Sequence, residues 1–259
     1  MAINTTIEDI INKLQKRANN IPEDLSKYSC PICKDAEFII SKDEKGIDRY
    51  RKCECVEAKV AQRLLNKSGI SEEFQTKTFN NFNDRGLELI KIAKFKAIEY
   101  YKSFDEIEND RINSILLCGQ VGSGKTHLGM ALANNLIKTK KVAVVYMEYR
   151  QTATKLKQLI TDDIEYNTEL NKYKHARVLF IDDLLKGKVT EADINLLYEI
   201  VNYRYLNKLP MIISTEKTKA ELIEFDEAIA SRIIEMSKGN IIELIGKELN
   251  YRLYGWNIV

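Results

Sequence analysis

The segment that most constrains the fold of this chain is Gly119-Gln-Val-Gly-Ser-Gly-Lys125-Thr126. It matches the pattern Gly-x4-Gly-Lys-Ser/Thr in full, follows the apolar run Ile115–Cys118 and opens a helical pattern. Its glycines let backbone N–H groups turn inward around a phosphate at the positive end of that helix. We expect Lys125 to reach the β- and γ-phosphates and the hydroxyl of Thr126 to bind Mg²⁺. The sequence therefore predicts a phosphate-binding loop between a buried strand and a helix.

From about residue 86 onward, short apolar runs alternate with helical patterns. The predicted strands cover 114–118, 142–147, 178–182, 211–215 and 241–244. The predicted helices cover 86–103, 124–138, 150–172, 190–206 and 218–235. This alternation is typical of a parallel sheet that is covered by helices on both faces. The predicted fold class is therefore α/β.

Two carboxylates follow the strand predicted at 178–182. Asp182 lies 57 residues after Lys125, and Asp183 follows it directly. We expect Asp182 to hold Mg²⁺ through water and Asp183 to polarise the water that attacks the phosphate. Paired acids at a strand end can instead cap a helix, but a phosphate loop in the same chain favours the catalytic interpretation.

Hydroxyls and an arginine extend this predicted site. The strand predicted at 211–215 ends in Ser214 and Thr215, which suits a sensor of the γ-phosphate or the water, and we prefer Thr215. Local hydrogen bonds at the strand end are the alternative. Arg232 lies 17 residues later on a predicted helix and is a candidate for an arginine that contacts the γ-phosphate of a neighbouring copy. A surface salt bridge is the alternative for Arg232.

Four of the five cysteines form a cluster in the sequence, namely Cys30, Cys33, Cys53 and Cys55. Strands predicted at 37–41 and 47–51 would form a hairpin that brings the two pairs together. Four thiolates in a reducing compartment indicate structural zinc, with an iron–sulfur cluster or unliganded thiols as alternatives. Cys118 lies in an apolar run and is predicted to be a buried strand residue.

The remaining segments suggest a domain order. Helices are predicted at about 6–19 and 56–66, and the polar stretch 71–83 carries three phenylalanines that we expect to pack on the following domain. We predict an N-terminal helix with a zinc-binding domain at 1–68, an aromatic linker at 69–85 and an ATPase-type domain at 86–259.

Overall charge and hydropathy exclude several classes of protein. Lys plus Arg is 40 and Asp plus Glu is 38, giving a formal net charge of +2, so binding to duplex DNA through bulk charge is not expected. The longest apolar runs are far shorter than the roughly 20 residues that span a bilayer. The N-terminus lacks the pattern of a secretory signal. We therefore expect a cytoplasmic protein without a membrane segment.

The order of these motifs resembles a known family. After the phosphate loop come Ile-Asp-Asp-Leu-Leu-Lys-Gly-Lys, Ile-Ile-Ser-Thr-Glu and Ala-Ser-Arg-Ile, and then soon the last residue. This order is similar to that of the bacterial and phage helicase loaders of the DnaC/DnaI type, which are AAA+ ATPases related to the transposition helper IstB. The resemblance covers roughly residues 70–259, and the cysteine-rich segment with its linker is similar to Gram-positive and phage members.

The resemblance implies a specific fold and site. It implies an AAA+ P-loop core with a five-stranded parallel sheet in the order 5-1-4-3-2 and a minimal or absent C-terminal lid. It makes Asp182 and Asp183 the Walker B acids, Thr215 or Ser214 the sensor 1 residue, and Arg232 the arginine finger. The ATP-binding residues that it implies are Gly119, Gln120, Val121, Gly122, Ser123, Gly124, Lys125, Thr126 and His127, with Mg²⁺ at Thr126 and Asp182.

The resemblance also implies partners. It predicts an ATP-dependent loader whose N-terminal region grips the hexameric replicative DNA helicase and which forms a homo-oligomer with ATP. A helical insertion at about 149–174 would contact single-stranded DNA, with Tyr146, Arg150, Lys155 and Lys157 as candidates. The alternatives are an IstB-like transposition helper on duplex DNA, a helicase adaptor that binds nucleotide without hydrolysis, and a small-molecule kinase.

Overall fold

The computed structural model describes residues 28–43, 45–67 and 72–255. The chain divides into two compact units, Met1–Val56 and Glu57–Val259. The helix predicted at 6–19 lies outside the described residues. The predicted domain limits at 68 and 85 stay predictions. Within the described residues, no helix combines the length and the apolar character needed to cross a membrane.

The first unit contains an antiparallel hairpin of β1 (Phe38–Lys42) and β2 (Asp48–Lys52). Both strands start and end one residue later than predicted. Asp43 sets the turn between them, because its Oδ1 accepts two backbone N–H bonds from the turn at 3.0 and 2.9 Å. Gly46 completes the turn with a φ of +76°, a conformation that glycine adopts without steric cost.

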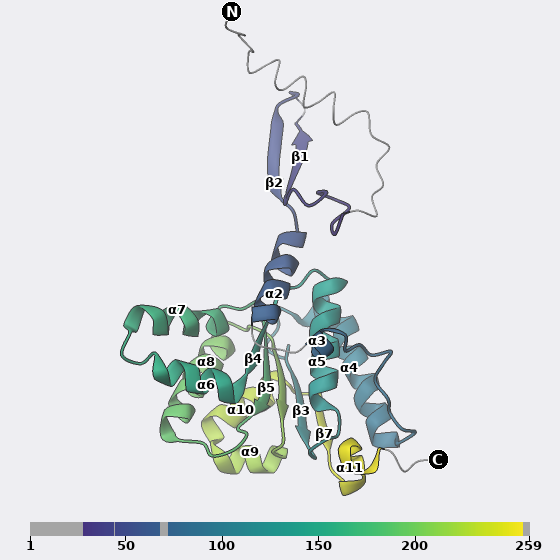
Figure 1. Cartoon of the computed structure of the whole chain (residues 1–259), viewed down its shortest axis with the longest axis vertical. Coiled ribbons are helices and arrows are strands. Elements are labelled where there is room, and N and C mark those ends of the chain that lie inside the picture. Colours follow the sequence, from purple (N-terminus) through teal and green to yellow (C-terminus); the bar gives the residue numbers. More distant parts are fainter. Residues whose placement is uncertain (1–27, 44, 68–71, 256–259) are drawn as a thin grey trace, which may run out of the picture. The chain divides into compact units, whose positions relative to one another are not determined.

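The second unit is built on a five-stranded parallel sheet (Figure 1). Its strands are β3 (Ile115–Gly119), β4 (Val144–Glu148), β5 (Val178–Leu184), β6 (Met211–Thr215) and β7 (Ile241–Leu244). They lie in the order β4-β5-β6-β3-β7, and all neighbours are parallel. Numbered from β3 as the first strand, this is the predicted order 5-1-4-3-2 read from the opposite edge. The predicted fold class and strand order are therefore confirmed.

Helices precede, connect and follow these five strands, and the first helix, α2, begins in the first unit. They are α2 (Cys55–Lys67), α3 (Glu72–Gln75), α4 (Glu88–Ile107), α5 (Lys125–Lys138), α6 (Tyr149–Gln158), α7 (Asp163–Lys174), α8 (Glu191–Leu206), α9 (Lys219–Phe225), α10 (Glu227–Met236), the 3-10 turn η2 (Lys247–Leu249) and α11 (Tyr251–Tyr254).

Two segments that were predicted as single helices are each two helices. The segment predicted at 150–172 breaks before Asp162, which accepts backbone N–H bonds at the start of α7. The segment predicted at 218–235 breaks at Asp226, whose side chain accepts the N–H of Ile229. A carboxylate that caps the second helix competes with continuation of the first one, and the apolar spacing does not reveal this.

Alternate residues of each strand enter two hydrophobic clusters, one on each face of the sheet. Ile115 and Leu117 belong to the cluster formed with α4 and α5, whereas Leu116 and Cys118 belong to the cluster formed with α6 to α10. Figure 1 shows the two groups of helices on opposite sides of the sheet. Burial on both faces explains why the strands read as continuous apolar runs. Cys118 is buried in a strand, as expected.

The aromatic segment before α4 packs on the first of these clusters. Phe79 and Phe82 are buried there, and Phe74 lies against its edge. The Nδ2 atom of Asn134 on α5 donates to the carbonyls of Phe74 and Lys77, at 3.2 and 2.9 Å. The expectation that these aromatics pack on the following residues is confirmed, and the segment is held beside the helix that follows the phosphate loop.

Candidate nucleotide site and candidate metal centre

The phosphate loop follows β3 and leads into α5. A Cβ atom at Gly119 would lie 2.3 Å from the carbonyl oxygen of Leu244, and one at Gly122 would lie 2.3 Å from Oδ1 of Asn250. Both glycines have positive φ, so they are needed for conformation and for space. Gly124 is the N-cap residue of α5, and no side chain accepts a hydrogen bond from the first N–H groups of this helix. The first N–H groups of this helix are therefore suited to a phosphate.

Lys125 is the first residue of α5; its side chain turns back into the phosphate loop, and the residue is 5% exposed. Its Nζ donates to the carbonyls of Gly119 and Gln120, at 2.8 and 2.6 Å. Burial lowers the pKa of Lys125 to about 8, although nearby carboxylates raise this pKa in part. Its acceptors are neutral carbonyls, which phosphate oxygens can replace as stronger partners.

Asp182 lies near the end of β5, beside the phosphate loop, and is 4% exposed. Its carboxylate accepts hydroxyl bonds from Thr126 at 2.9 Å, from Tyr146 at 2.9 Å and from Ser214. Burial is the main cause that raises the pKa of this carboxyl. A carboxylate and a hydroxyl in direct contact are oxygen donors of the kind that Mg²⁺ prefers, so the residues fit the expected ion.

The buried position of Tyr146 corrects one expectation. It lies on β4, is 7% exposed and gives its hydroxyl to Asp182. Its ring also packs edge-on against Phe180 at a centroid distance of 5.3 Å. The ring is therefore not open to a nucleic-acid base, and we assign Tyr146 to the carboxylate site and not to a DNA surface.

Asp183 and the hydroxyls of Ser214 and Thr215 on β6 lie next to Asp182 and its contacts. The backbone N–H of Asp183 donates to Oγ of Ser214 at 3.0 Å, and its Oδ2 accepts from Lys186 at 2.7 Å. Thr215 is fully buried and gives its hydroxyl to the carbonyl of Leu184 at 2.8 Å. Ser214 therefore contacts both acids, whereas Thr215 holds the backbone. These contacts favour Ser214 over Thr215 as the sensor residue.

Lys125, Thr126, Asp182 and Asp183 line a cavity of about 600 Å³, whereas Ser214 and Thr215 do not line it. Its walls also include residues outside the predicted ATP-binding and catalytic set, which are Phe74, Asn81, Phe82, Asn83, Arg85 and Ile90 before and within α4, Glu148 at the end of β4, Lys186, Glu216, Tyr251 and Arg252. Its volume suits a nucleotide-sized ligand. The cluster of phenylalanines in a polar linker is the sequence signal that could have revealed this wall.

His127 fixes the wall formed by the linker. Its Nε2 lies 3.1 Å from the carbonyl of Thr78 and 3.1 Å from Oδ1 of Asn81. Its ring meets the edge of Phe82 at 5.1 Å between centroids. Burial lowers the pKa of His127, so the neutral ring is favoured. The structure thus places His127 in the cavity wall as a contact to the linker.

Arg232 lies on α10 and points toward α8. Its Nε donates to Oδ1 of Asn202 at 3.0 Å, and its NH1 donates to the carbonyl of Ala228 at 2.6 Å. Its guanidinium also lies 5.1 Å from the ring centroid of Tyr198. Arg232 does not line the cavity that contains Lys125. Contact with the phosphate of a neighbouring copy therefore stays a prediction.

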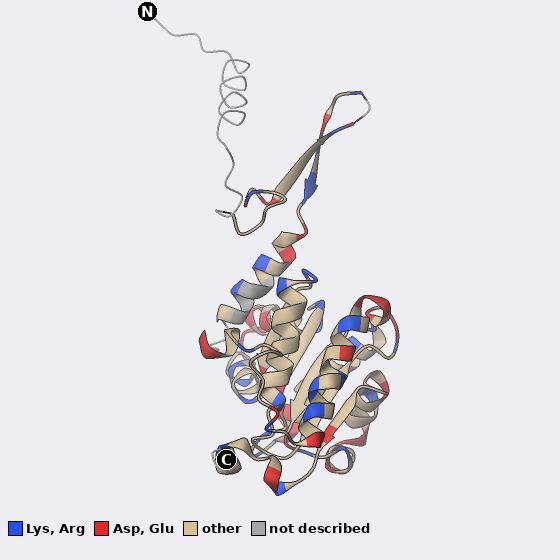
Figure 2. Cartoon of the chain, turned by 90° about the vertical axis from the view of Figure 1, so that its right-hand side faces the viewer, with Lys and Arg blue, Asp and Glu red and all other residues tan. Residues whose placement is uncertain are grey.

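The basic residues predicted to contact DNA lie on α6. Lys155 forms an ion pair with Glu169 at 3.0 Å, and Lys157 forms one with Asp193 at 2.8 Å. Arg150 is exposed and lines a shallow hollow together with Lys155. Basic and acidic residues are interspersed over the helices of this unit (Figure 2). A DNA contact through α6 would therefore require the two lysines to exchange protein carboxylates for phosphates.

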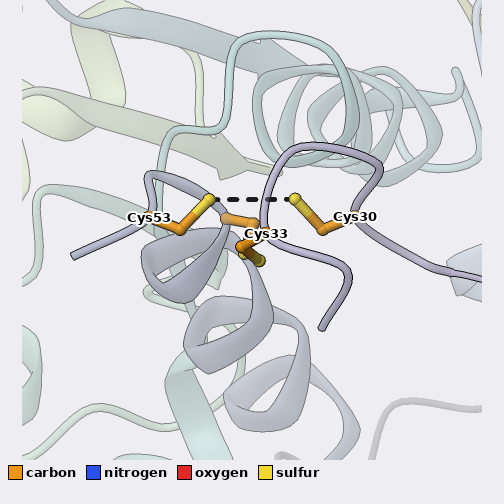
Figure 3. A group of neighbouring side chains, drawn as sticks. Cys30, Cys33 and Cys53 are labelled. Carbon is orange, nitrogen blue, oxygen red and sulfur yellow. Dashed lines mark hydrogen bonds between the residues drawn. The ribbon is translucent and has the colours of Figure 1, made fainter. Parts of the chain in front are cut away.

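The four clustered cysteines meet beside the hairpin of the first unit. All four are buried, and their sulfur atoms lie within 4.8 Å of one another. The Sγ atoms of Cys30 and Cys53 face each other at 3.8 Å (Figure 3). Those of Cys33 and Cys55 lie 3.5 Å apart. All are free thiols. The hairpin thus joins two pairs that are separated in the sequence.

This geometry fits a tetrahedral zinc ion. Four sulfurs at a Zn–S distance of about 2.3 Å are about 3.8 Å apart in a regular tetrahedron. Backbone N–H groups of Cys33 and Ile32 lower the pKa of Cys30 to about 6, which favours its thiolate. Four protein ligands leave no open coordination position, so a zinc ion here would be structural.

Sequence comparisons place these sites among known proteins. The family model described as "IstB-like ATP binding protein" matches residues 51–239. The phage-like element PBSX protein XkdC of Bacillus subtilis is 37% identical, over 96% of this chain and 98% of that protein. The uncharacterized protein YqaM of Bacillus subtilis is 34% identical, over 99% of this chain and 98% of that protein.

Solved structures share the fold. A crystal structure of DnaI gives a TM-score of 0.58 at 22% identity, covering 68% of this chain and 95% of the chain in that structure. A crystal structure of the DnaC helicase loader gives a TM-score of 0.54 at 18% identity, covering 68% of this chain and 100% of that structure. At these identities the likeness concerns the α/β AAA+ fold.

Proposed function

Because the chain belongs to the IstB-like ATP-binding protein family, we propose that it is an ATP-hydrolysing loader that delivers a hexameric replicative DNA helicase onto single-stranded DNA. The proposal rests on the separation of Arg232 from the other predicted catalytic residues. Lys125, Thr126, Asp182 and Asp183 line one cavity, whereas Arg232 lies outside it. A site divided in this way suits an ATPase that works between neighbouring copies.

Groups in and beside the cavity would serve ATP hydrolysis. Lys125 would exchange its carbonyl partners for phosphate oxygens at the start of α5. A bound Mg²⁺, held by Thr126 and Asp182, would neutralise phosphate charge. Asp183 would orient the attacking water and accept its proton, while Ser214 keeps the two acids in register. Hydrolysis is a proposal that rests on this arrangement.

The γ-phosphate would act as the switch between assembly states. Arg232 of one copy would reach the γ-phosphate bound by its neighbour, which stabilises a homo-oligomer with ATP. Loss of the γ-phosphate would remove that contact and weaken the assembly. Arg150, Lys155 and Lys157 on α6 are the proposed contacts to single-stranded DNA.

The N-terminal region at 1–68 is the proposed helicase-binding part. It would hold its cysteine hairpin with zinc while the AAA+ unit binds ATP. The similarity of the fold to the DnaC helicase loader supports a helicase as partner. Two other functions would use the same fold, namely a transposition helper on duplex DNA and an adaptor that binds ATP without hydrolysis. The presence of both acids beside the phosphate loop favours the loader over the adaptor.

Native mass spectrometry of the chain with the replicative helicase of its host, with and without ATP, tests the proposal. We expect an ATP-dependent complex near a 6:6 ratio, with one zinc ion on each small subunit. Lys125→Ala should weaken the response to ATP, because the phosphates lose their main cation. Lys188→Ala is the matched control, since Lys188 is exposed in the loop after β5.

Each alternative predicts a different outcome of this measurement. Absence of a complex in every nucleotide state would reject the loader proposal for that helicase. Self-assembly on duplex DNA would instead favour the transposition helper. A helicase complex that forms with ATP, combined with no ATP turnover under any condition, would favour the adaptor.

A further inference from the structure

Lys186 is a second cation of the nucleotide cavity, and it binds two carboxylates. Its Nζ lies 2.7 Å from Oδ2 of Asp183 and 3.1 Å from Oε1 of Glu216. All three residues line the cavity. Asp183 is the proposed carboxylate that orients the attacking water. Lys186 donates a hydrogen bond to one of the two carboxylate oxygens that could accept from this water.

The last residues of β5 and the loop that follows them hold Lys186 in this position. Asp183 and Leu185 have φ values of +54° and +60°, a conformation that is uncommon and costly for residues other than glycine. Burial of the Leu184 and Leu185 side chains keeps the loop in this shape. The hydroxyl of Thr215 bonds the carbonyl of Leu184, and the N–H of Lys186 bonds the carbonyl of Asp183 at 3.1 Å. The contact between Lys186 and Asp183 is thus supported by the buried backbone.

The two lysines of the cavity differ in their partners. Lys125 is buried and donates to neutral carbonyl oxygens, which a phosphate displaces without separating opposite charges. Lys186 is about two-fifths exposed, with its side chain at 39%, and donates to two anions. A phosphate would have to compete with both carboxylates for it. Lys125 is therefore arranged to bind phosphate, and Lys186 is arranged to hold carboxylates.

We propose that Lys186 is a latch that restrains Asp183 and keeps ATP hydrolysis slow while the two are paired. Glu216 binds the same ammonium group of Lys186 and so helps to hold it beside Asp183. Lys186 is a positioning residue, because it acts through Asp183 and not on the phosphate. This inference rests on the proposed hydrolysis at Asp183.

A charge-matched double variant tests the latch. Lys186→Met removes the ammonium and keeps the alkyl chain, and Glu216→Gln removes one carboxylate. Together they leave the trio of Asp183, Lys186 and Glu216 with its original net charge of one negative, so the attraction of the cavity for ATP is preserved. We expect turnover at saturating ATP to rise about fivefold, which is the rate equivalent of one exposed ion pair. The dissociation constant for ATP should change by less than about twofold.

A second readout follows the lysine itself. Amine labelling of the intact chain, read by mass spectrometry, should modify Lys186 more slowly than the exposed Lys188, because its ammonium is paired. Glu216→Gln alone should speed the labelling of Lys186 and leave that of Lys188 unchanged. Lys188→Met is the control for turnover and should behave as the wild type. Asp183→Asn should abolish turnover with or without Lys186.

Three results would overturn the latch. The first is turnover in the double variant at or below the wild-type level, including no turnover in either protein although both bind ATP. The second is a selective loss of affinity for ATP over ADP, which would mean that Lys186 contacts the γ-phosphate. The third is equal labelling of Lys186 and Lys188. The loader proposal is tested separately by the helicase complex, so faster turnover without that complex would support the latch and reject the loader.

Discussion

The two units of this chain are stabilised by different interactions. In the described part of the first unit, the buried cluster consists of four cysteines and Val56, with Ile39 packed against it. The second unit has two large aliphatic and aromatic clusters, one on each face of its sheet. Such a small cluster buries too little apolar surface to order a hairpin by itself. We therefore expect the described hairpin of the first unit to depend on a metal held by the four cysteines, whereas the second unit depends on apolar burial.

The largest expected effect is removal of the metal. Structural zinc contributes on the order of 10 kcal/mol to the folding of small zinc domains. Cys33→Ser, or a strong chelator, should therefore unfold the hairpin at 38–52. The second unit should keep its thermal transition and its ATP affinity. Hydrogen exchange read by mass spectrometry over both units measures the two responses together.

Cys118→Ala is the control for this substitution, because Cys118 is buried in β3 and lies outside the cluster. That variant should retain one zinc per chain. Loss of protection in both units after chelation would contradict the comparison, since it would make the metal a determinant of the whole chain.

The next effect concerns a buried cation in the second unit. Arg204 is fully buried, and its guanidinium donates to the carbonyls of Tyr173, Ala176 and Pro210, at 2.9, 2.8 and 2.7 Å. Arg204→Met removes these three bonds from buried carbonyls, although the carbonyl of Pro210 keeps the N–H of Leu179 as a donor, and should cost about 3 kcal/mol of unfolding free energy. Calorimetry should show a lower melting temperature for the second unit with zinc content unchanged. Lys238→Met, at an exposed position, should leave the transition in place.

ATP binding should also distinguish the units. Lys125→Ala removes the buried ammonium of the phosphate loop and should weaken ATP affinity about 100-fold, consistent with the loss of a charge-assisted contact of about 2–3 kcal/mol. ATP should raise the melting temperature of the second unit in the wild type and not in the variant. Equal stabilisation by ATP in both proteins would place the nucleotide elsewhere.

The smallest effect tests a single helix cap. Asp226 separates α9 from α10 and accepts the N–H of Ile229 at 2.8 Å. Asp226→Ala should cost about 1 kcal/mol of unfolding free energy, because one N–H of the helix that carries Arg232 loses its acceptor. Urea denaturation measures this change, and Glu224→Ala at an exposed position of α9 is the control. Equal midpoints for the two variants would show that the cap is unimportant.

The sequence was sufficient for the features that depend on local pattern. The strands are buried between helices on both faces and form unbroken apolar runs, so the sequence pattern located them to within a few residues, whereas their order was implied by the family resemblance. The phosphate loop was evident because its glycines are required by close backbone approaches, as at Gly119 against Leu244. The cysteine cluster could be inferred because a hairpin joins its two pairs.

Features that depend on tertiary contacts were missed or misjudged. Tyr146 occupies a strand position that could face either side of the sheet, and only the fold brings its hydroxyl to Asp182. Ser214 and Thr215 offer the same chemistry in the sequence, and the alternation of β6 decides which one meets the acids. Lys186 looked like an ordinary charged loop residue, because its partner Glu216 is distant in the sequence.

We propose above that this chain uses ATP to place a ring-shaped helicase on single-stranded DNA. The most direct measurement is unwinding of an oligonucleotide annealed to a closed circle of single-stranded DNA, which offers no free end to a closed ring. With the host helicase and ATP, we predict that the wild-type chain accelerates unwinding, that Lys188→Ala does the same, and that Lys125→Ala does not. Unwinding at the same rate with and without the chain would contradict the account.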